Sequence, residues 1–155
     1  MKKLIAYFSP SGNTKAMAEK LAKATGADLF EIKPQTPYTR ADLDWTNKNS
    51  RSSIEMNDKN FRPQIAQLPN SLADYDTIFI GFPIWWYVAP TIINTFVENV
   101  DLDGKKVIPF ATSGGSGMGK TLANLKQSCP GANWVEGKVI NGMSEKALAD
   151  WAEKL

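Results

Sequence analysis

The chain has 155 residues, no histidine and a single cysteine, Cys129. These counts exclude a Ser-His-Asp triad, a Cys-His pair, an imidazole metal ligand and an intramolecular disulfide, which leaves any chemistry to other side chains or to a cofactor. The net charge is only +2, from 18 Lys and Arg against 16 Asp and Glu with the basic residues scattered, so we expect no nucleic-acid partner.

Short apolar runs alternate with amphipathic stretches along the chain. No run approaches the ~20 apolar residues of a membrane helix, so we expect a cytoplasmic protein without a membrane partner. The runs predict strands at 4–8, 29–32, 77–80, 106–111 and 134–140. Amphipathic spacing predicts helices around Met17–Ala24, Ile92–Val100, Leu122–Leu125 and Leu148–Leu155. Because strands and helices alternate, the sequence predicts one α/β domain over residues 1–155, with a parallel sheet covered by helices on both faces.

Residues 34–68 are polar and weakly periodic, and they predict at most one helix, around Leu43–Met56. One interpretation is a solvated connection. The alternative is a partner-binding surface in a module without redox function, formed by Trp45, Arg51 and Arg62. The acidic residues of this stretch lack metal-ligand spacing, and we propose no metal there; they are Asp42, Asp44, Glu55 and Asp58.

Three loops at the carboxyl ends of predicted strands carry unusual residues, and ligands of open parallel sheets bind at that edge. The first loop follows strand 4–8 and reads Ser9-Pro10-Ser11-Gly12-Asn13-Thr14. Hydroxyls and free amides at a helix N-terminus favour a phosphate. The alternative is an ordinary helix cap, since Ser, Asn and Thr favour such positions.

The second loop follows strand 77–80 and reads Pro83-Ile84-Trp85-Trp86-Tyr87. Three adjacent aromatic residues cannot all point into the core, so we expect at least one ring to stack on a flat ligand. The alternatives are a lid packed on the next helix and a contact between copies of the chain.

The third loop follows strand 106–111 and reads Thr112-Ser113-Gly114-Gly115-Ser116-Gly117-Met118-Gly119. Its four glycines let the backbone approach a ligand closely, although a flexible surface loop would have the same composition. Residues Gly114–Thr121 also match the P-loop pattern G-x-x-x-x-G-K-[ST]. A nucleotide hydrolase would in addition need a magnesium-binding aspartate after an apolar strand, and the later strand ends Val139-Ile140-Asn141 without one.

Taken in this order, the three loops resemble those of the flavodoxin family, and most closely a short flavodoxin-like branch with P-x-W-W and T-S-G-G-S-G loops. The resemblance covers essentially the whole chain. It implies a flavodoxin-like three-layer sandwich with five parallel strands in the order 2-1-3-4-5 and one non-covalently bound FMN. It also implies electron transfer, with either a redox partner protein or a small donor or acceptor such as NAD(P)H or a quinone.

The resemblance implies a role for each loop. The FMN phosphate would be held by Ser9, Ser11, Gly12, Asn13 and Thr14. The isoalloxazine would be lined by Pro83, Ile84 and Trp85, with Trp85 favoured over Trp86 and Tyr87 as the stacking ring. Its other edge would be contacted by backbone amides of Thr112, Ser113, Gly114, Gly115, Ser116 and Gly117.

Two departures from the family pattern favour a reductase over an electron carrier. Carriers of the family are strongly acidic, whereas this chain is slightly basic. Gly114 and Gly115 stand where many relatives place an aromatic residue, which would leave one flavin face open to a substrate. Cys129 lies away from the three loops, and we expect an incidental thiol.

Overall fold

A computed structural model describes residues 2–155 and contains a parallel sheet with the strand order β2-β1-β3-β4-β5. Its strands are β1 (Lys2–Tyr7), β2 (Asp28–Glu31), β3 (Tyr75–Pro83), β4 (Lys106–Thr112), β5 (Asn133–Trp134) and β6 (Lys138–Val139). Both β5 and β6 pair with β4, so together they occupy the fifth position. The predicted order 2-1-3-4-5 is confirmed.

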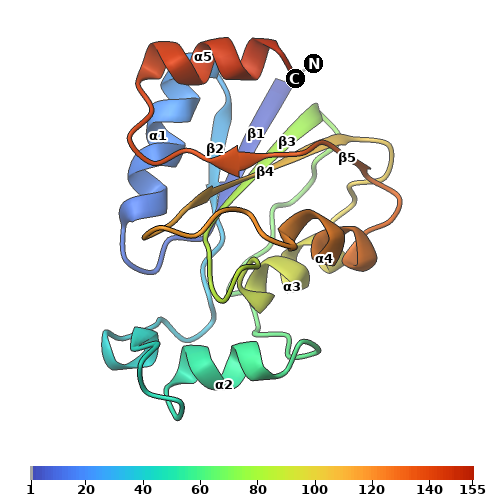
Figure 1. The fold of residues 1–155 in the computed structure, drawn as a ribbon. Coiled ribbons are helices and arrows are strands. Elements are labelled where there is room, and N and C mark those ends of the chain that lie inside the picture. Colours follow the sequence, from blue (N-terminus) through green and yellow to red (C-terminus); the bar gives the residue numbers. More distant parts are fainter. Residues whose placement is uncertain (1) are drawn as a thin grey trace.

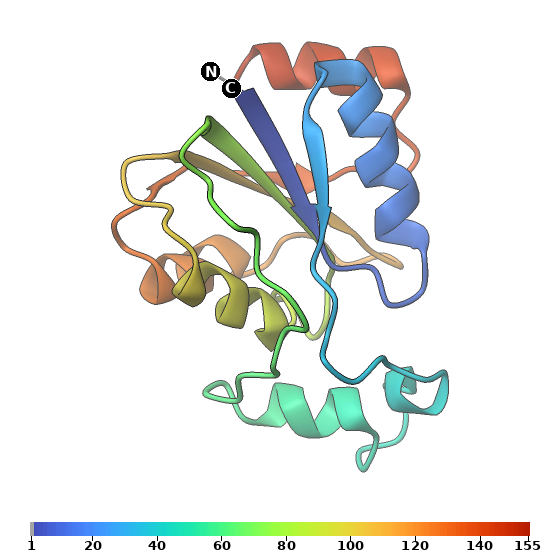
Figure 2. The ribbon, with the colours of Figure 1, turned by 180° about the vertical axis from the view of Figure 1, so that it is seen from behind.

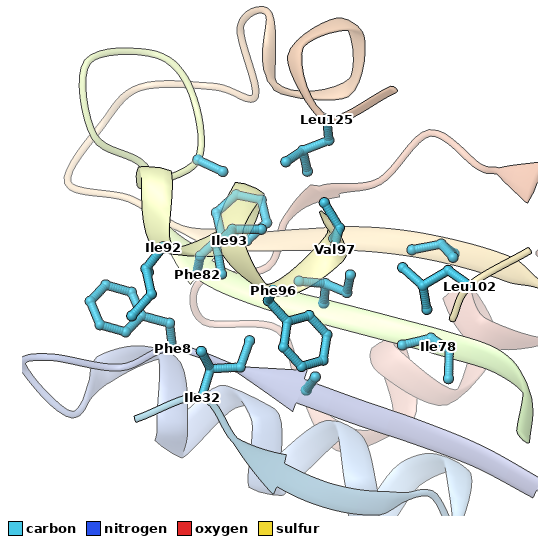
Figure 3. Close-up of a cluster of buried hydrophobic side chains, with 14 of the residues drawn as sticks. Phe8, Ile32, Ile78, Phe82, Ile92, Ile93, Phe96, Val97, Leu102 and Leu125 are labelled. Atoms are coloured by element: carbon cyan, nitrogen blue, oxygen red, sulfur yellow. The ribbon is translucent and has the colours of Figure 1, made fainter. Parts of the chain in front are cut away.

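Helices cover both faces of the sheet, as predicted (Figure 1). On one face lie α1 (Asn13–Thr25) and α5 (Glu145–Glu153), and on the other α3 (Thr91–Asn99) and α4 (Thr121–Ser128). Each face has its own buried apolar cluster. In the larger cluster, Ile93, Phe96 and Val97 of α3 pack over the sheet near Ile78 and Phe82 of β3 (Figure 3). Burying both faces explains why the central strands are almost uninterrupted apolar runs.

The fifth strand position differs from the prediction of one strand over 134–140. In β4, Val107 and Ala111 direct their carbonyls toward the last strand, accepting from Val135 and Ile140, so Pro109 between them faces it too. Proline has no N–H to donate, and the ladder is interrupted beside it. The register shifts by one residue between the pairs Val107↔Trp134 and Phe110↔Lys138. The predicted strand is therefore divided into β5 and β6.

Residues 34–68 extend beyond the carboxyl ends of the strands, at the end of the molecule opposite the termini (Figure 2). An antiparallel bridge between Pro34 and Ile65 forms the base of this segment. It contains a 3-10 turn, η1 (Ala41–Leu43), and one helix, α2 (Arg51–Asn57). The predicted helix around Leu43–Met56 is thus shorter, because Ser50 caps α2 by accepting the Ser53 N–H and so fixes its start. Within residues 2–155, no helix is both long and apolar enough to cross a membrane.

Candidate functional site

The three loops predicted from the sequence meet at the carboxyl edge of the sheet. Phe8, directly after β1, donates its N–H to Gly81 O of β3 at 2.9 Å. Ile84, after β3, donates to Thr112 O of β4 at 3.0 Å. These bonds hold the three strand ends in register, so the loops that follow them form one continuous surface.

The first loop (Ser9–Thr14) leads into α1 without a side-chain cap. Gly12 stands at the cap position with φ 93°, in the left-handed region that favours glycine. Ser9 Oγ accepts the Lys15 N–H at 2.9 Å, while Ser11 and Asn13 are exposed. Within the described residues, the N–H groups of Gly12, Asn13 and Thr14 have no protein acceptor. Serine side chains cap α2 and α5, whereas α1 shares the lack of a side-chain cap with α3 and α4. The start of α1 therefore presents free donors at the positive end of a helix dipole.

Thr14 and Thr112 join the first loop to the third. Their hydroxyl oxygens lie 2.7 Å apart, and both side chains are buried. Each hydroxyl has one proton and two lone pairs, so the pair satisfies one donor and one acceptor internally. The pair leaves the second proton available to a neighbouring acceptor.

The aromatic loop (Pro83–Tyr87) forms a tight reverse turn. Trp85 and Val88 exchange two backbone hydrogen bonds, of 3.0 and 3.2 Å. The two central residues, Trp86 and Tyr87, have φ of 50° and 67°. Bulky residues rarely adopt positive φ, and such strain costs about 1–3 kcal/mol per residue. The turn leaves the Trp86 and Tyr87 side chains exposed, at 45% and 66%.

Trp85 is half-buried at the inner side of this turn. Its ring meets Phe8 and Tyr38 edge to face, with centroids 5.7 Å apart in both pairs. As expected, the three aromatic residues do not all point into the core, since Trp86 and Tyr87 are exposed, and the stacking of a ring on a ligand stays a prediction. Pro83 and Ile84 are also half-buried beside Trp85.

The glycine loop (Thr112–Gly119) is held at its start by Asn141. The Asn141 side chain accepts the Ser113 N–H at 2.8 Å and donates to Ser113 O at 2.9 Å. Ser113 Oγ in turn accepts the Gly115 N–H at 3.2 Å. A Cβ at Gly114, Gly115 or Gly117 would meet open space, and Ser116 between them is half-buried. The loop thus has a fixed base and an uncovered surface.

The P-loop alternative is not supported. Thr121, which would have to reach Mg²⁺, is fully buried and donates its hydroxyl proton to Met118 O. Lys120 N–H donates to Tyr87 O at 3.2 Å, so the end of the glycine loop packs against the aromatic turn. Residues 120 and 121 thus hydrogen-bond within the chain, and the Thr121 hydroxyl is not directed toward a nucleotide site.

The partner-surface alternative for residues 34–68 rested on Trp45, Arg51 and Arg62, and the two arginines form ion pairs within the chain. Arg51 Nε donates to Glu55 Oε2 at 3.0 Å. Arg62 binds Glu98 of α3 in a two-pronged pair at 2.7 and 3.1 Å. Trp45 is 74% exposed. The arginines therefore fix the segment to itself and to α3, and the alternative is not supported.

Four residues at or beside the site were not assigned to it from the sequence: Tyr38, Arg51, Glu55 and Asn141. Glu55 is only 3% exposed, and one of its carboxylate oxygens accepts the Tyr38 hydroxyl proton. Burial and this hydrogen bond raise the pKa of Tyr38 far above its usual range, which keeps its hydroxyl protonated. Asn141 directly follows the predicted strand 134–140 and lies two residues after β6, so its place at the carboxyl edge was the available signal.

Other titratable groups lie away from the loops. Burial raises the pKa of the Cys129 thiol, consistent with an unreactive side chain. Among residues 2–155, no three Cys, Asp or Glu side chains gather closely enough to hold a metal ion. A hollow of about 730 Å³ lies inside the 34–68 segment, lined in part by Arg51 and Arg62 but by none of the predicted site residues.

An open parallel sheet with its specialised loops after β1, β3 and β4 defines a doubly wound protein, a class whose ligands bind where the strand order reverses. The family model described as Flavodoxin matches residues 2–155, and the chain belongs to the flavodoxin family.

Three known proteins illustrate the relationship. A crystal structure of a candidate flavoprotein from Bacteroides eggerthii is 53% identical, with a TM-score of 0.95, over 99% of this chain and 96% of that chain. A flavoprotein from Lactobacillus acidophilus, solved in complex with FMN, is 25% identical, with a TM-score of 0.67, over 97% and 98% of the two chains. The uncharacterized NAD(P)H oxidoreductase YcaK of Escherichia coli is 29% identical over 98 residues, 63% of this chain and 45% of that protein. The match thus spans less than half the length of this curated relative.

Proposed function

We propose that the chain binds one FMN non-covalently at the three loops and acts as a small NAD(P)H-dependent reductase of a quinone-type acceptor. The observation that carries the proposal is the meeting of the three loops at the carboxyl edge of the sheet, joined by the Thr14–Thr112 and Ile84–Thr112 bonds. The FMN complex of the Lactobacillus protein and the NAD(P)H oxidoreductase relative support it. Bound FMN would supply the redox chemistry that these side chains lack.

The residues at the loops fit this cofactor. A phosphate suits the uncapped N–H groups at the start of α1, together with the hydroxyls and amide of Ser9, Ser11 and Asn13. The flat apolar ring system suits the Pro83–Tyr87 turn, where Trp85 forms an inner wall and Trp86 and Tyr87 offer exposed rings. The Ser113 and Gly115 N–H groups are already hydrogen-bonded at the base of the glycine loop, so the polar edge would be contacted by the exposed backbone of Gly114 and Gly117, which no side chain covers.

Two features favour a reductase over an electron carrier. The net charge of +2 gives no strong negative field to steer the chain to a basic partner protein. Gly114, Gly115 and Gly117 leave open space above the glycine loop, where a nicotinamide or a quinone ring has room to approach the cofactor.

An absorption spectrum followed by rapid mixing with NADH or NADPH tests the proposal. The purified chain should be yellow, or turn yellow with added FMN, and either nicotinamide should bleach it directly. A chain that stays colourless in FMN contradicts cofactor binding. Bleaching that requires a separate reductase protein contradicts the reductase assignment and indicates a carrier.

The open glycine loop gives a sharper test. Gly114→Trp should fill the space above the loop and slow direct bleaching by roughly tenfold, about 1.4 kcal/mol in the barrier, while FMN affinity stays within about threefold of the wild type. Gly114→Ala is the matched control, because one methyl group there meets open space. Equal bleaching rates in the two variants would show that the substrate does not approach from this side.

A further inference from the structure

The 34–68 segment places one side chain beside the loops of the proposed site. The ring of Tyr38 meets Phe8 at a centroid distance of 5.5 Å and Trp85 at 5.7 Å, both edge to face. Phe8 directly follows β1, and Trp85 belongs to the aromatic loop. Tyr38 therefore packs against an indole that lines the proposed flavin site.

Arg51 and Glu55 of α2 fix the Tyr38 ring from the other side. The Arg51 guanidinium lies over that ring, 3.7 Å from its centroid. Its Nη1 donates to Thr36 O at 2.7 Å and to Pro37 O at 3.2 Å, and its Nε donates to Glu55 Oε2 at 3.0 Å. Glu55 Oε1 accepts the Tyr38 hydroxyl proton. The ring is thus held at its face and at its hydroxyl by two residues of one helix.

We propose that Arg51, Glu55 and Tyr38 are positioning residues that hold the Trp85 indole in place for the flavin. This inference rests on the proposed function, because it gives Trp85 a cofactor to contact. It assigns the 34–68 segment a role in the site, beyond that of a connection between β2 and β3.

The chemistry of the three side chains explains why their types matter. A guanidinium is planar, so it can stack on the Tyr38 ring while its edge binds a carboxylate and two carbonyls. A lysine at position 51 would keep the positive charge, but it has neither a planar group to stack on the Tyr38 ring nor the several N–H donors of a guanidinium. Glu55 is 3% exposed, and a buried carboxylate is stable only when its oxygens are paired. Replacing Arg51 or Glu55 therefore releases the other residue of the pair and also the Tyr38 ring that both hold.

The experiment follows Trp85 directly, in protein without FMN. The chain is labelled with 5-fluorotryptophan, and the Trp85 fluorine resonance is assigned from its loss in Trp85→Phe. Arg51→Lys and Tyr38→Leu should each shift or broaden this resonance. Tyr38→Phe, which retains the ring, should change it less than Tyr38→Leu does.

Arg62→Lys is the matched control. Arg62 also attaches the 34–68 segment to the rest of the fold, through Glu98 of α3, but its hydrogen bonds go to Glu98, Lys59 and Phe61 and none goes to Tyr38. This variant should leave the Trp85 resonance unchanged. A Trp85 resonance that moves equally in Arg62→Lys and Arg51→Lys would overturn the inference, because loosening the segment in general would then be the cause. An unmoved resonance in both Arg51→Lys and Tyr38→Leu would overturn it too.

A second measurement connects the positioning to the cofactor. FMN should bind Arg51→Lys and Tyr38→Leu roughly three- to tenfold more weakly than the wild type, as expected for a displaced aromatic contact, and Arg62→Lys with wild-type affinity. Circular dichroism checks folding. If Arg51→Lys does not fold, the same two measurements are made on Glu55→Gln, with the same expected results. If the wild type binds no FMN but the Trp85 resonance responds to the substitutions as expected, the proposed function fails and with it the link to the flavin, while the holding of Trp85 by Tyr38, Arg51 and Glu55 is retained. Unchanged FMN affinity beside a moved resonance overturns the link to the flavin.

Discussion

Gly137 and Pro109 lie opposite each other, and the close approach of their backbones explains why position 137 is a glycine. A Cβ at Gly137 would overlap the carbonyl oxygen of Pro109, so the backbone of the last strand passes closer to β4 than any side chain permits. This approach occurs where Pro109 lacks an N–H and the hydrogen-bond ladder is interrupted. Glycine is required there by the space available, whereas Gly114 of the glycine loop has open space around it.

Gly137→Ala should therefore lower the free energy of unfolding by about 1–3 kcal/mol, because a backbone atom has to move to admit the methyl group. Gly114→Ala should leave it within about 1 kcal/mol of the wild type. Urea unfolding, followed by circular dichroism without FMN, measures both. Equal midpoints for the two variants would contradict the steric explanation.

The Thr14–Thr112 pair predicts strong coupling between two loops. Replacing either threonine by valine leaves the other buried hydroxyl without this partner, at a cost of about 1–3 kcal/mol. The double variant leaves neither hydroxyl, so its loss of stability should be smaller than the sum of the two single losses. A double-mutant cycle in urea tests this, and strictly additive losses would show that the hydroxyls do not depend on each other.

At the scale of elements, the strands were predictable because burial on both faces makes each of them an apolar run. The interruption between β5 and β6 was not, since its cause, Pro109, lies in the neighbouring strand. The start of α2 depends on the Ser50 cap inside a polar stretch that has several equally good candidates. The three loops were predictable as a group because all follow strands. Tyr38 was not predictable, because its partner Glu55 lies in another part of the polar segment, and for Asn141 the sequence offered its place after a predicted strand but not its partner Ser113.

Asn141 joins the end of β6 to the glycine loop, and its removal should free the start of that loop. Asn141→Ala should speed amide hydrogen exchange at Ser113 by roughly 10- to 100-fold, as expected for losing two hydrogen bonds. Asn133→Ala is the control. Asn133 begins β5, away from the glycine loop, and its side chain donates a hydrogen bond to Gly104 O. Unchanged exchange at Ser113 in Asn141→Ala would contradict the assigned role.

At the scale of the whole molecule, the proposed site joins three loops and, through Tyr38, the 34–68 segment. A ligand that binds only this assembled edge stabilises the entire fold. The fold and the family were predictable from the sequence, because they depend on the order of strands and loops. How the loops and the segment contact one another depends on side-chain packing, and only the structure describes it.

FMN at about 100 times its dissociation constant should stabilise the chain by about 2.7 kcal/mol, which raises the melting temperature by roughly 5–10 °C for a protein of this size. Riboflavin, which lacks the phosphate, should give a smaller increase because the donors at the start of α1 stay unused. Magnesium ATP should give none. Differential scanning calorimetry compares the three ligands, and an ATP effect as large as that of FMN would restore the P-loop reading of residues 114–121.

The division of the last strand also affects how molecules of this protein meet in solution. An edge strand normally presents a continuous row of backbone donors and acceptors, to which a strand of another molecule can add. Here that edge consists of two strands of two residues each, Asn133–Trp134 and Lys138–Val139, separated by a bulge. A strand of another molecule could therefore pair with only two residues before the row of backbone donors and acceptors is interrupted and the pairing register changes. The same proline that removes a hydrogen bond within the sheet thereby protects this edge against aggregation.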